Sequence, residues 1–470
     1  MSPAEMAAEA ILRARKFGKR TYYYATDRPG GTYVASESLH KLISPSSPVD
    51  VLARFREPAG FHLAPGLANP SATALCLKRH NRESAEEILR EASGILHHAV
   101  PVFGRTVQLD QDINWHADPT SGVSWPFLHY TRVPIRMGGG ADVRVVWELN
   151  RLSHLVTLGQ AYSITRDERY TEEFIKQLSS WYIRNPPRFG VNWIGAMEPA
   201  IRSGNLLAAL ELFRDSPLLE GDPIEIILKL LLSHGRFVRA NLEFSHYVTS
   251  NHYLSDLIGL FTLGALLPEF PESKQWLSFG ISELIREMNR QILPDGVDYE
   301  GSTAYHRFAL EIYLCFFVLS RQLDIELSPE HQEKLESMFD FVRHYLNTGG
   351  LAPTIGDSDD GRLLRFKSRS PMDHSYLMSI AAVYFTDGAF KRSQALDPEA
   401  IWWFGPEGAK TFEGLPARLK EPVSKAYTDS QIVIQRSGAL YLIADCGDHG
   451  AAGHGSHAHS DALSFELSAY

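Results

Sequence analysis

Cysteine is scarce in this sequence, and the cysteines that are present form no pattern. The 470 residues contain three of them, Cys76, Cys315 and Cys446, far apart and odd in number. Such spacing predicts neither a disulfide framework nor a CxxC metal site. Cys315 lies in an apolar run with helical spacing, where a cysteine behaves as a small hydrophobic residue.

Long apolar runs and an excess of positive charge are also missing. No run of 18 apolar residues occurs, which excludes a transmembrane helix of ordinary length. Residues 1–20 lack the apolar core of a signal peptide. Lys and Arg number 46 against 56 Asp and Glu, a net charge of -10. This charge argues against nucleic acid as a partner, and an anionic substrate would require basic residues to cluster locally.

The composition that is present is that of an ordinary globular protein. Hydrophobic residues make up 44% and charged residues 22%, enough material for a large core. The length favours two or three domains.

The first part of the chain is predicted to be mixed in structure. Residues 1–20 favour a short helix, residues 21–80 are rich in Gly, Pro and Ser and predict irregular structure, and residues 84–98 favour a second helix. Residues 100–140 form an aromatic, loop-rich stretch that ends in three consecutive glycines. Long irregular segments are often functional.

From about residue 141 to 390 the apolar spacing becomes helical, and after Pro416 it becomes typical of strands. Pro and Gly between the helices favour antiparallel hairpins, so the predicted fold class is mainly α: an incomplete α/α toroid followed by the first strands of a β-sandwich domain. We therefore divide the chain into an irregular and helical segment, a toroid and the start of a β domain, at 1–100, 101–415 and 416–470. The helices are expected at 142–163, 168–184, 197–214, 222–245, 250–267, 272–293, 302–323, 328–348 and 374–386, and the strands at 430–435, 439–446 and 463–470.

The most informative motif is glycine-rich and lies at residues 453–461. It places His457 and His459 one residue apart, followed by Asp461. In an extended strand, residues i and i+2 share a face, so both imidazoles could enter one metal or catalytic site; a structural histidine pair is the alternative. Because the chain stops within ten residues of this motif, we expect a fragment of a longer protein, with unpaired strand edges that favour inactivity or aggregation.

The helix expected at 197–214 carries a polar face. Glu198, Arg202 and Asn205 stand at i, i+4 and i+7, and Glu198 before Arg202 is the favourable order for an ion pair. The face could line a barrel interior or be solvated. Trp193, just before the helix, could stack on a sugar or belong to the core.

Two further helix starts carry polar residues. Asn251 and His252 follow Ser250, a good N-cap; an Asn amide beside a helix N-terminus suits an anionic group, although Asn251 could merely cap the helix. Tyr305 is either a core residue or a phenol whose pKa is lowered by the neighbouring cations His306 and Arg307.

The Asp/Gly loop at residues 355–362 is also acidic. It lacks the spacing of an EF-hand calcium loop, and a solvated turn is the simpler interpretation.

Together these blocks resemble the heparinase II/III-like polysaccharide lyases, most of all the heparinase III branch and the oligoalginate lyases of the same architecture. The matching blocks lie in order within residues 190–470, and each is weak by itself. They are residues 192–202, 250–252, 295–306, 356–359 and 453–467. The resemblance implies an α/α toroid followed by a β-sandwich, a periplasmic location, and β-elimination on a uronic-acid-containing polysaccharide.

The resemblance also implies roles for single residues. Asn251 would neutralise the substrate carboxylate with His252 beside it, Tyr305 would be the acid/base phenol, and His457 the partner base. His459 would bind one structural divalent metal, usually zinc with calcium as the alternative, most other ligands lying beyond residue 470. No organic cofactor is expected. The predicted substrate-binding residues are Trp193, Glu198, Arg202, His306 and Arg307.

These residue types fit the chemistry of elimination. The C5 proton of a uronate is hardly acidic while the adjacent carboxylate is charged, so donors from Asn, His or Arg must offset that charge. A base then removes the proton and an acid protonates the leaving O4. One tyrosine can serve both steps in a syn elimination, whereas a tyrosine and a histidine can serve an anti elimination.

Two other functions remain open from the sequence. A glycoside hydrolase on a toroid would need two carboxylates, for which Asp256, Asp298 and Glu300 are candidates. A non-catalytic polysaccharide-binding protein would tolerate Tyr305→Phe, whereas a lyase would lose most turnover. The partner expected in each case is an anionic polysaccharide or oligosaccharide.

Overall fold

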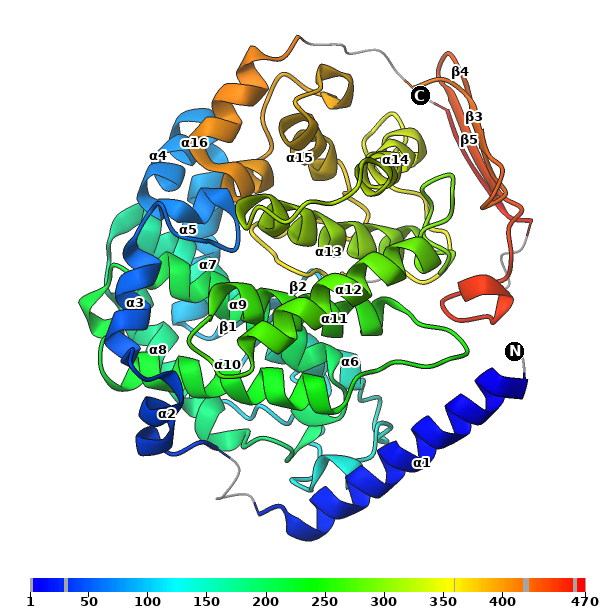
Figure 1. The fold of residues 1–470 in the computed structure, drawn as a ribbon. Coiled ribbons are helices and arrows are strands. Elements are labelled where there is room, and N and C mark those ends of the chain that lie inside the picture. The colour runs from blue at the N-terminus through cyan, green and yellow to red at the C-terminus, as the bar shows by residue number, and fades with distance from the viewer. Residues whose placement is uncertain (1–2, 29–32, 359, 417–421, 460–462, 470) are drawn as a thin grey trace. The chain divides into compact units, whose positions relative to one another are not determined.

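The computed structural model describes residues 3–28, 33–358, 360–416, 422–459 and 463–469 (Figure 1). The chain divides into two compact units, which we describe separately. The first comprises residues 1–63 and 86–281, and the second residues 64–85 and 282–470. Two helices, α5 (Arg82–Leu96) and α12 (Ser273–Gln291), run across the division.

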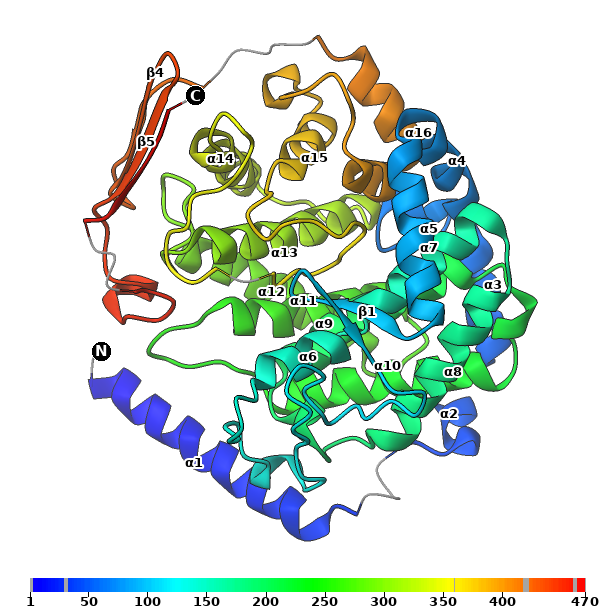
Figure 2. The same ribbon diagram turned by 180° about the vertical axis from the view of Figure 1, so that it is seen from behind.

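The first unit is built around α9 (Met197–Phe213), in which every residue is buried. Four helices pack on it: α6, α7, α10 and α11. The helix is rich in Leu and Ala, which can be covered on all sides. Besides α9 the unit contains α1 (Pro3–Thr26), α2 (Ser36–Ile43), α3 (Pro48–Arg56), α6 (Val143–Asn150), α7 (Ser153–Thr165), α8 (Arg169–Arg184), α10 (Asp222–Ala240), α11 (Asn251–Leu266) and the antiparallel hairpin of β1 (Ala99–Val102) and β2 (Arg105–Gln108), seen from behind in Figure 2.

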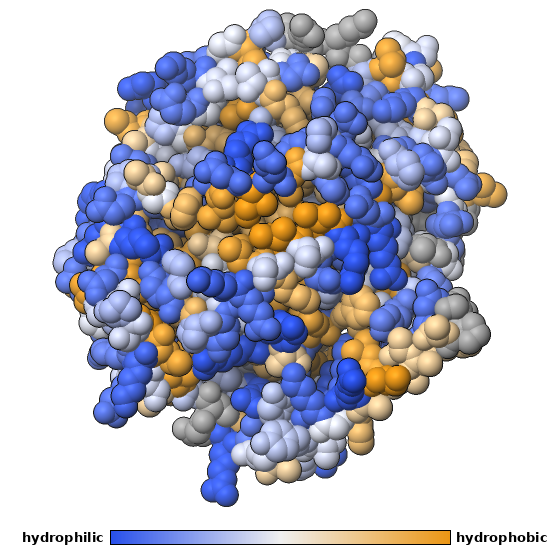
Figure 3. Space-filling view, in the orientation of Figure 1, coloured by the Kyte–Doolittle hydropathy of each residue, from blue (hydrophilic) through white to orange (hydrophobic). Residues whose placement is uncertain are grey.

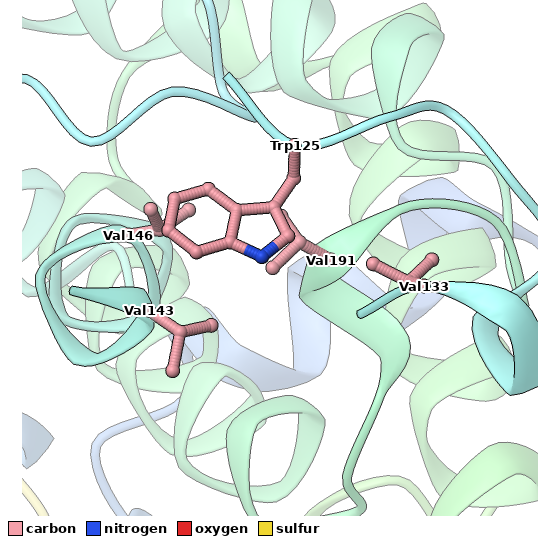
Figure 4. Close-up of a cluster of buried hydrophobic side chains, with 5 residues drawn as sticks. All are labelled: Trp125, Val133, Val143, Val146 and Val191. Atoms are coloured by element: carbon pink, nitrogen blue, oxygen red, sulfur yellow. The ribbon is translucent and has the colours of Figure 1, made fainter. Parts of the chain in front are cut away.

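The aromatic stretch at residues 100–140 is largely irregular after the β1–β2 hairpin, and its tryptophans belong to the core. Trp125 is 2% exposed and packs with four valines that come from this stretch, from α6 and from the turn before α9. Figure 4 shows this cluster of Trp125, Val133, Val143, Val146 and Val191. The stretch is therefore fixed against α6 by burial of apolar surface.

The second unit combines helices with a small sheet. Its helices are α4 (Pro70–His80), α13 (Thr303–Gln322), α14 (Pro329–Tyr345), α15 (Tyr376–Phe385) and α16 (Pro398–Gly414). The antiparallel sheet has the order β3 (Lys425–Tyr427), β4 (Ile432–Ser437), β5 (Leu440–Asp445) and β6 (Phe465–Ala469).

One face of this sheet is covered and the other is open. Ile434 and Tyr441 are at most 1% exposed, whereas Phe465 and Leu467 are more than 60% exposed. On the face of the molecule drawn in Figure 3, hydrophilic and hydrophobic residues are interspersed. None of the helices in the described residues has the length and apolar character needed to cross a bilayer.

The structure differs from the predicted elements mainly near the N-terminus and around residue 400. The segment predicted to be irregular contains α2, α3 and α4, because Pro48 and Pro70 start helices instead of breaking them. The helix predicted at 142–163 is broken at Leu152, which has a left-handed φ of 61°. The sequence prediction missed α16, the β1–β2 hairpin and β3. The three-part domain division stays a prediction.

Candidate active site

The first group of candidate residues meets at the start of α13 in the second unit. Ser302 caps this helix, its hydroxyl accepting a hydrogen bond from the Tyr305 amide at 3.3 Å. Tyr305 therefore lies in the first turn, where the helix dipole favours negative charge on a nearby group. It is half-buried, and its ring centroid lies 3.9 Å from that of His457. Tyr305 is therefore not the fully buried core residue that the sequence left open as an alternative.

His457 is held by carboxylates at both ring nitrogens. Its Nε2 lies 3.1 Å from Glu300 Oε2, and its Nδ1 lies 3.2 Å from Asp357 Oδ2. Burial alone would lower the pKa of His457, but the hydrogen bonds and charges of Glu300 and Asp357 outweigh burial and raise the pKa above its ordinary value. With a carboxylate at each nitrogen, the ring is favoured as an imidazolium that donates twice.

The backbone around His457 is tightly packed against the loop that carries Asp357. The Asp357 amide donates to the His457 carbonyl at 2.8 Å, and a Cβ on Gly356 would lie 2.7 Å from that same oxygen. Gly356 has a φ of 66°, so glycine is required here by both the space and the backbone. His457 itself has a left-handed φ of 62°, a strain often found at functional sites.

His459 reaches the same carboxylate from the other side. Its Nε2 lies 2.6 Å from Asp357 Oδ1, while the side chain is 60% exposed. Residues 457 and 459 lie in a turn and an irregular segment instead of the extended geometry that would place both on one face, yet the two imidazoles do share a partner. Asp461 lies outside the described residues. Burial of Asp357 is outweighed by its bonds to both histidines, which lower its pKa.

The described residues provide only some of the ligands that the predicted structural metal would need. His459 and Asp357 supply an imidazole and a carboxylate, donor types that suit zinc. Across the described residues, however, no group of three or more His, Cys, Asp or Glu side chains is placed to hold a metal ion. The described residues therefore do not make a complete metal site.

The second group of candidates lies at the start of α11 in the first unit. Asn251 is the first residue of this helix and is fully buried. His252 beside it is 43% exposed, and its Nδ1 lies 2.8 Å from Glu243 Oε2. The other oxygen of Glu243 accepts from the amides of Ala196 and Met197 at 2.7 and 3.0 Å. His252 is thus oriented by an acid that is itself fixed to the start of α9.

Glu243 is held as a carboxylate by these contacts. Burial would raise the pKa of Glu243, but the charge and hydrogen bond of His252 and the two amides lower it to about 2. The pKa of Asp256 is shifted the other way. Burial first, and then the charge of Glu243, raise the pKa of Asp256 well above its ordinary range. The pKa values of the two neighbouring acids are therefore shifted in opposite directions.

The polar face predicted on α9 is not open to solvent in the structure. Glu198 is 4% exposed and binds Arg151 Nε at 3.0 Å, in place of the predicted pair with Arg202. Asn205 donates to the Arg151 carbonyl at 3.0 Å. Glu198 and Asn205 thus fix the end of α6 onto α9.

Arg202 and Trp193 are likewise buried, each 0% exposed. Arg202 donates to the carbonyls of Asn150 and Asn192 at 2.6 and 3.3 Å, and its guanidinium lies 4.4 Å from the Trp181 ring. Burial lowers the pKa of Arg202 to about 9, which leaves it charged at neutral pH. The indole of Trp193 donates to the Asn185 carbonyl at 3.1 Å. Arg202 and Trp193 therefore have no exposed surface for their predicted role in substrate binding.

His306 and Arg307 also point into the core of their unit instead of toward Tyr305. His306 is 1% exposed, accepts from the Asp298 amide, and its Nε2 lies 3.1 Å from the Met338 carbonyl. Burial lowers the pKa of His306 to about 4, so it is not the cation expected from the sequence. Arg307 is 1% exposed and donates to the Gly361 carbonyl at 2.8 Å.

Three acids that hold the candidate histidines were not among the predicted site residues. Glu300 appeared only as a hydrolase candidate, Asp357 was assigned to a solvated turn, and Glu243 was not considered. The match of residues 356–359 to the resembled family could have identified Asp357. No local pattern identifies Glu243, which lies nine residues before its histidine partner.

Comparison with solved structures identifies the fold class. A crystal structure of heparinase III superimposes with a TM-score of 0.61 at 18% identity, covering 96% of this chain and 63% of that one. This likeness shows a shared fold and confirms the predicted class, a mainly helical α/α toroid type followed by strands.

The family follows from sequence models. The model described as Heparinase II/III N-terminus matches residues 69–373, and the model described as Heparinase II/III-like, C-terminal, matches residues 420–470. The chain therefore belongs to the heparinase II/III-like family, which confirms the resemblance seen in its motifs.

Two curated relatives are heparin-sulfate lyases. The one from Pedobacter heparinus is 26% identical over 254 residues, which is 52% of this chain and 35% of the relative. The one from Bacteroides thetaiotaomicron is 25% identical over 203 residues, 42% of this chain and 28% of the relative. The matches span about a third of the length of these curated relatives.

Proposed function

We propose that the chain is part of a polysaccharide lyase that cleaves a uronic-acid-containing polymer by β-elimination. The observation that carries the proposal is the close contact of the Tyr305 ring with the His457 ring, with the imidazole held between Glu300 and Asp357. Family membership and the names of the heparin-sulfate lyase relatives support the reaction class. The relatives' names also suggest an anionic, heparan-type polymer as the substrate.

In this proposal Tyr305 exchanges the protons. As a phenolate it removes the C5 proton of the uronate; the C4–O4 bond breaks as the C4–C5 double bond forms, and the phenol returns the proton to O4. One residue serving both steps fits a syn elimination. Two features favour the phenolate: the N-terminal end of α13 and the positive charge of His457 within ring contact.

His457 then acts as a charged partner of Tyr305. The sequence suggested His457 as the base, but an imidazole with a carboxylate at each nitrogen has no free lone pair to accept the C5 proton. Glu300 and Asp357 are positioning residues that keep the ring protonated and oriented. His459, through Asp357, would contribute to the same positioning.

His252 is proposed to neutralise the substrate carboxylate. Asn251 beside it is 0% exposed at the first position of α11, so its proposed role is to support that end of the helix, where the dipole favours an anion. His252 is 43% exposed and fixed by Glu243, so it could donate to a carboxylate oxygen. Offsetting that charge stabilises the enolate-like intermediate, as an oxyanion hole does.

The hydrolase alternative is not favoured by the structure. Its candidate carboxylates, Asp256, Asp298 and Glu300, are at most 1% exposed, whereas an inverting or retaining hydrolase needs two acids that flank the bond and reach water. The buried Asp298 has a pKa raised well above its ordinary range, first by burial and then by Glu300.

The decisive experiment is a substrate panel of heparan sulfate, hyaluronan, chondroitin, alginate and bacterial exopolysaccharides. A lyase forms unsaturated ends that absorb in the near ultraviolet, without the mass of an added water. A hydrolase adds one water for each bond that it cleaves and forms no unsaturated end. Products of the second kind, or binding without any product, would refute the proposal.

A further inference from the structure

The first unit contains a cavity of about 250 Å³ whose lining includes none of the candidate residues described above. Its wall is formed by the C-terminal part of α10, the C-terminal part of α1 and the turn after α8. The residues used below are Tyr23, Arg188, Ser233, Arg236, Phe237 and Asn241. Drug-sized ligands occupy roughly 300–1,000 Å³, so this cavity suits one sugar residue or a smaller group.

Two arginines line the cavity, and each is anchored by an acid through a single nitrogen. Arg188 Nη1 binds both oxygens of Asp27 at 2.8 and 2.9 Å, and Arg236 Nε binds Glu272 Oε1 at 2.7 Å. The remaining guanidinium nitrogens of both residues make no hydrogen bond to the described part of the chain. Anchored arginines with free N–H groups are pre-organised to bind a carboxylate or sulfate.

Positive charge exceeds negative charge around this cavity. Lys19 donates to the carbonyl of Ala240 at the cavity wall at 2.8 Å. Burial first, and then the charges of Arg239 and Arg188, lower the pKa of Lys19, which places these cations near one another. The anchoring acids offset only part of that charge. A chain of net charge -10 thus has a locally basic hollow of the kind that a polyanion requires.

The rest of the wall fits a sugar better than a bare ion. The rings of Tyr23 and Phe237 supply apolar surface, and Ser233 and Asn241 supply polar groups. Arg188 lies 4.4 Å from the Tyr23 ring centroid and has a left-handed φ of 72°. A non-glycine residue held in that conformation carries backbone strain, which is common where a side chain must be held toward a ligand.

We infer that this cavity is a saccharide subsite for one anionic sugar residue, whose carboxylate or sulfate is bound by Arg188 and Arg236. The identity of the ligand as a sugar rests on the proposed function; the anion binding rests on the cavity alone. The subsite would hold the polymer at a point other than the bond that is cut. It would therefore affect affinity for the polymer and not the chemical step.

Direct binding tests the inference without any turnover. The intact protein is titrated by calorimetry at low ionic strength with glucuronate, glucose 6-sulfate, inorganic sulfate and glucose. The Arg188→Gln/Arg236→Gln variant is expected to lose on the order of tenfold in affinity for the charged sugars, about 1.4 kcal/mol. A preference for glucuronate or for glucose 6-sulfate identifies the group that the arginines hold.

Controls separate charge loss from misfolding. Arg169→Gln removes an exposed arginine that pairs with Asp167, as Arg188 pairs with Asp27, and should bind as the wild type does. Arg236→Gln alone keeps the Arg188 anchor and should show a smaller loss, and Arg188→Lys keeps the charge but loses the planar fork. Equal binding of the double variant and the wild type, or equal binding of glucose and glucuronate, would overturn the subsite.

The subsite and the proposed reaction can fail separately. If polymer is cleaved, the double variant should raise KM on the order of tenfold with kcat unchanged. Arginine-dependent binding without unsaturated products refutes the lyase and keeps the subsite. Unsaturated products with an unchanged KM and unchanged binding refute the subsite and keep the lyase.

Discussion

Arg202 in the first unit and the histidine pair of the second unit are polar residues held in different ways, because the first is buried and the others are accessible. In the first unit Arg202 is enclosed by carbonyls and tryptophans and is 0% exposed. In the second unit His457 and His459 lie in a turn and an irregular segment, with side chains 17% and 60% exposed and carboxylates behind them. The comparison separates groups that can touch a substrate from groups that hold the scaffold, although both kinds are polar and lie in motifs of one family.

The largest effect is expected at Tyr305. If it is the acid/base residue, Tyr305→Phe removes the exchanged proton and lowers kcat by roughly 10²–10⁴-fold with little change in the melting temperature. Product absorbance and differential scanning calorimetry on the same preparation measure both quantities. Tyr22→Phe, at a tyrosine 64% exposed on α1, is the matched control. Retained turnover in Tyr305→Phe would remove this residue from the mechanism.

Substitution of Arg202 should do the reverse and affect stability more than activity. Arg202→Met keeps much of the volume but leaves the buried carbonyls of Asn150 and Asn192 without their donor, which costs about 3 kcal/mol of unfolding free energy. Denaturant unfolding measures the loss. Arg169→Met, at an exposed arginine, should cost less than about 1 kcal/mol. A raised KM with unchanged stability would instead restore Arg202 as a substrate-binding residue.

The pH dependence of the unfolding free energy should distinguish Glu243, the acid that binds His252, from an ordinary surface acid. The pKa of Glu243 in the folded state is about 2, below the ordinary 4.5, so its stabilisation is complete above about pH 4.5 and is lost as the pH falls toward 2. Glu243→Gln should lower the unfolding free energy at pH 7 by roughly 2 kcal/mol, and the difference from the wild type should shrink on acidification.

Unfolding in urea at pH 7 and at pH 3 measures the difference for Glu243. Glu407→Gln, at a side chain 87% exposed, should show no such dependence. A pH-independent difference for Glu243→Gln would mean that its contacts with His252 and the amides do not favour the charged form.

The sequence was sufficient for elements whose signal is local. The long helices from α8 to α14 follow the predicted spacing closely, and the histidine motif identified the pair that shares a carboxylate. Local spacing could not predict the partners of that pair, because Asp357 lies 100 residues before His457; only the match of residues 356–359 to the resembled family pointed to Asp357. Periodicity also could not show that α9 is covered on all sides, so the sequence left open whether its polar face lines an interior or is a solvated or structural pair.

The smallest effect on activity is expected at His306, next to Tyr305 in sequence but directed into the core. Its pKa of about 4 keeps the ring neutral from pH 5 to 8, so it cannot supply the positive charge beside the phenol. His306→Gln should cost about 1–2 kcal/mol of stability, because the Asp298 amide and the Met338 carbonyl lose a well-placed partner. The pH profile of kcat should keep its shape in this variant. A shifted profile would mean that His306 titrates and takes part in the acid/base chemistry. Burial would then no longer distinguish scaffold residues from catalytic ones, and the assignment of Tyr305 and His457 depends on that distinction.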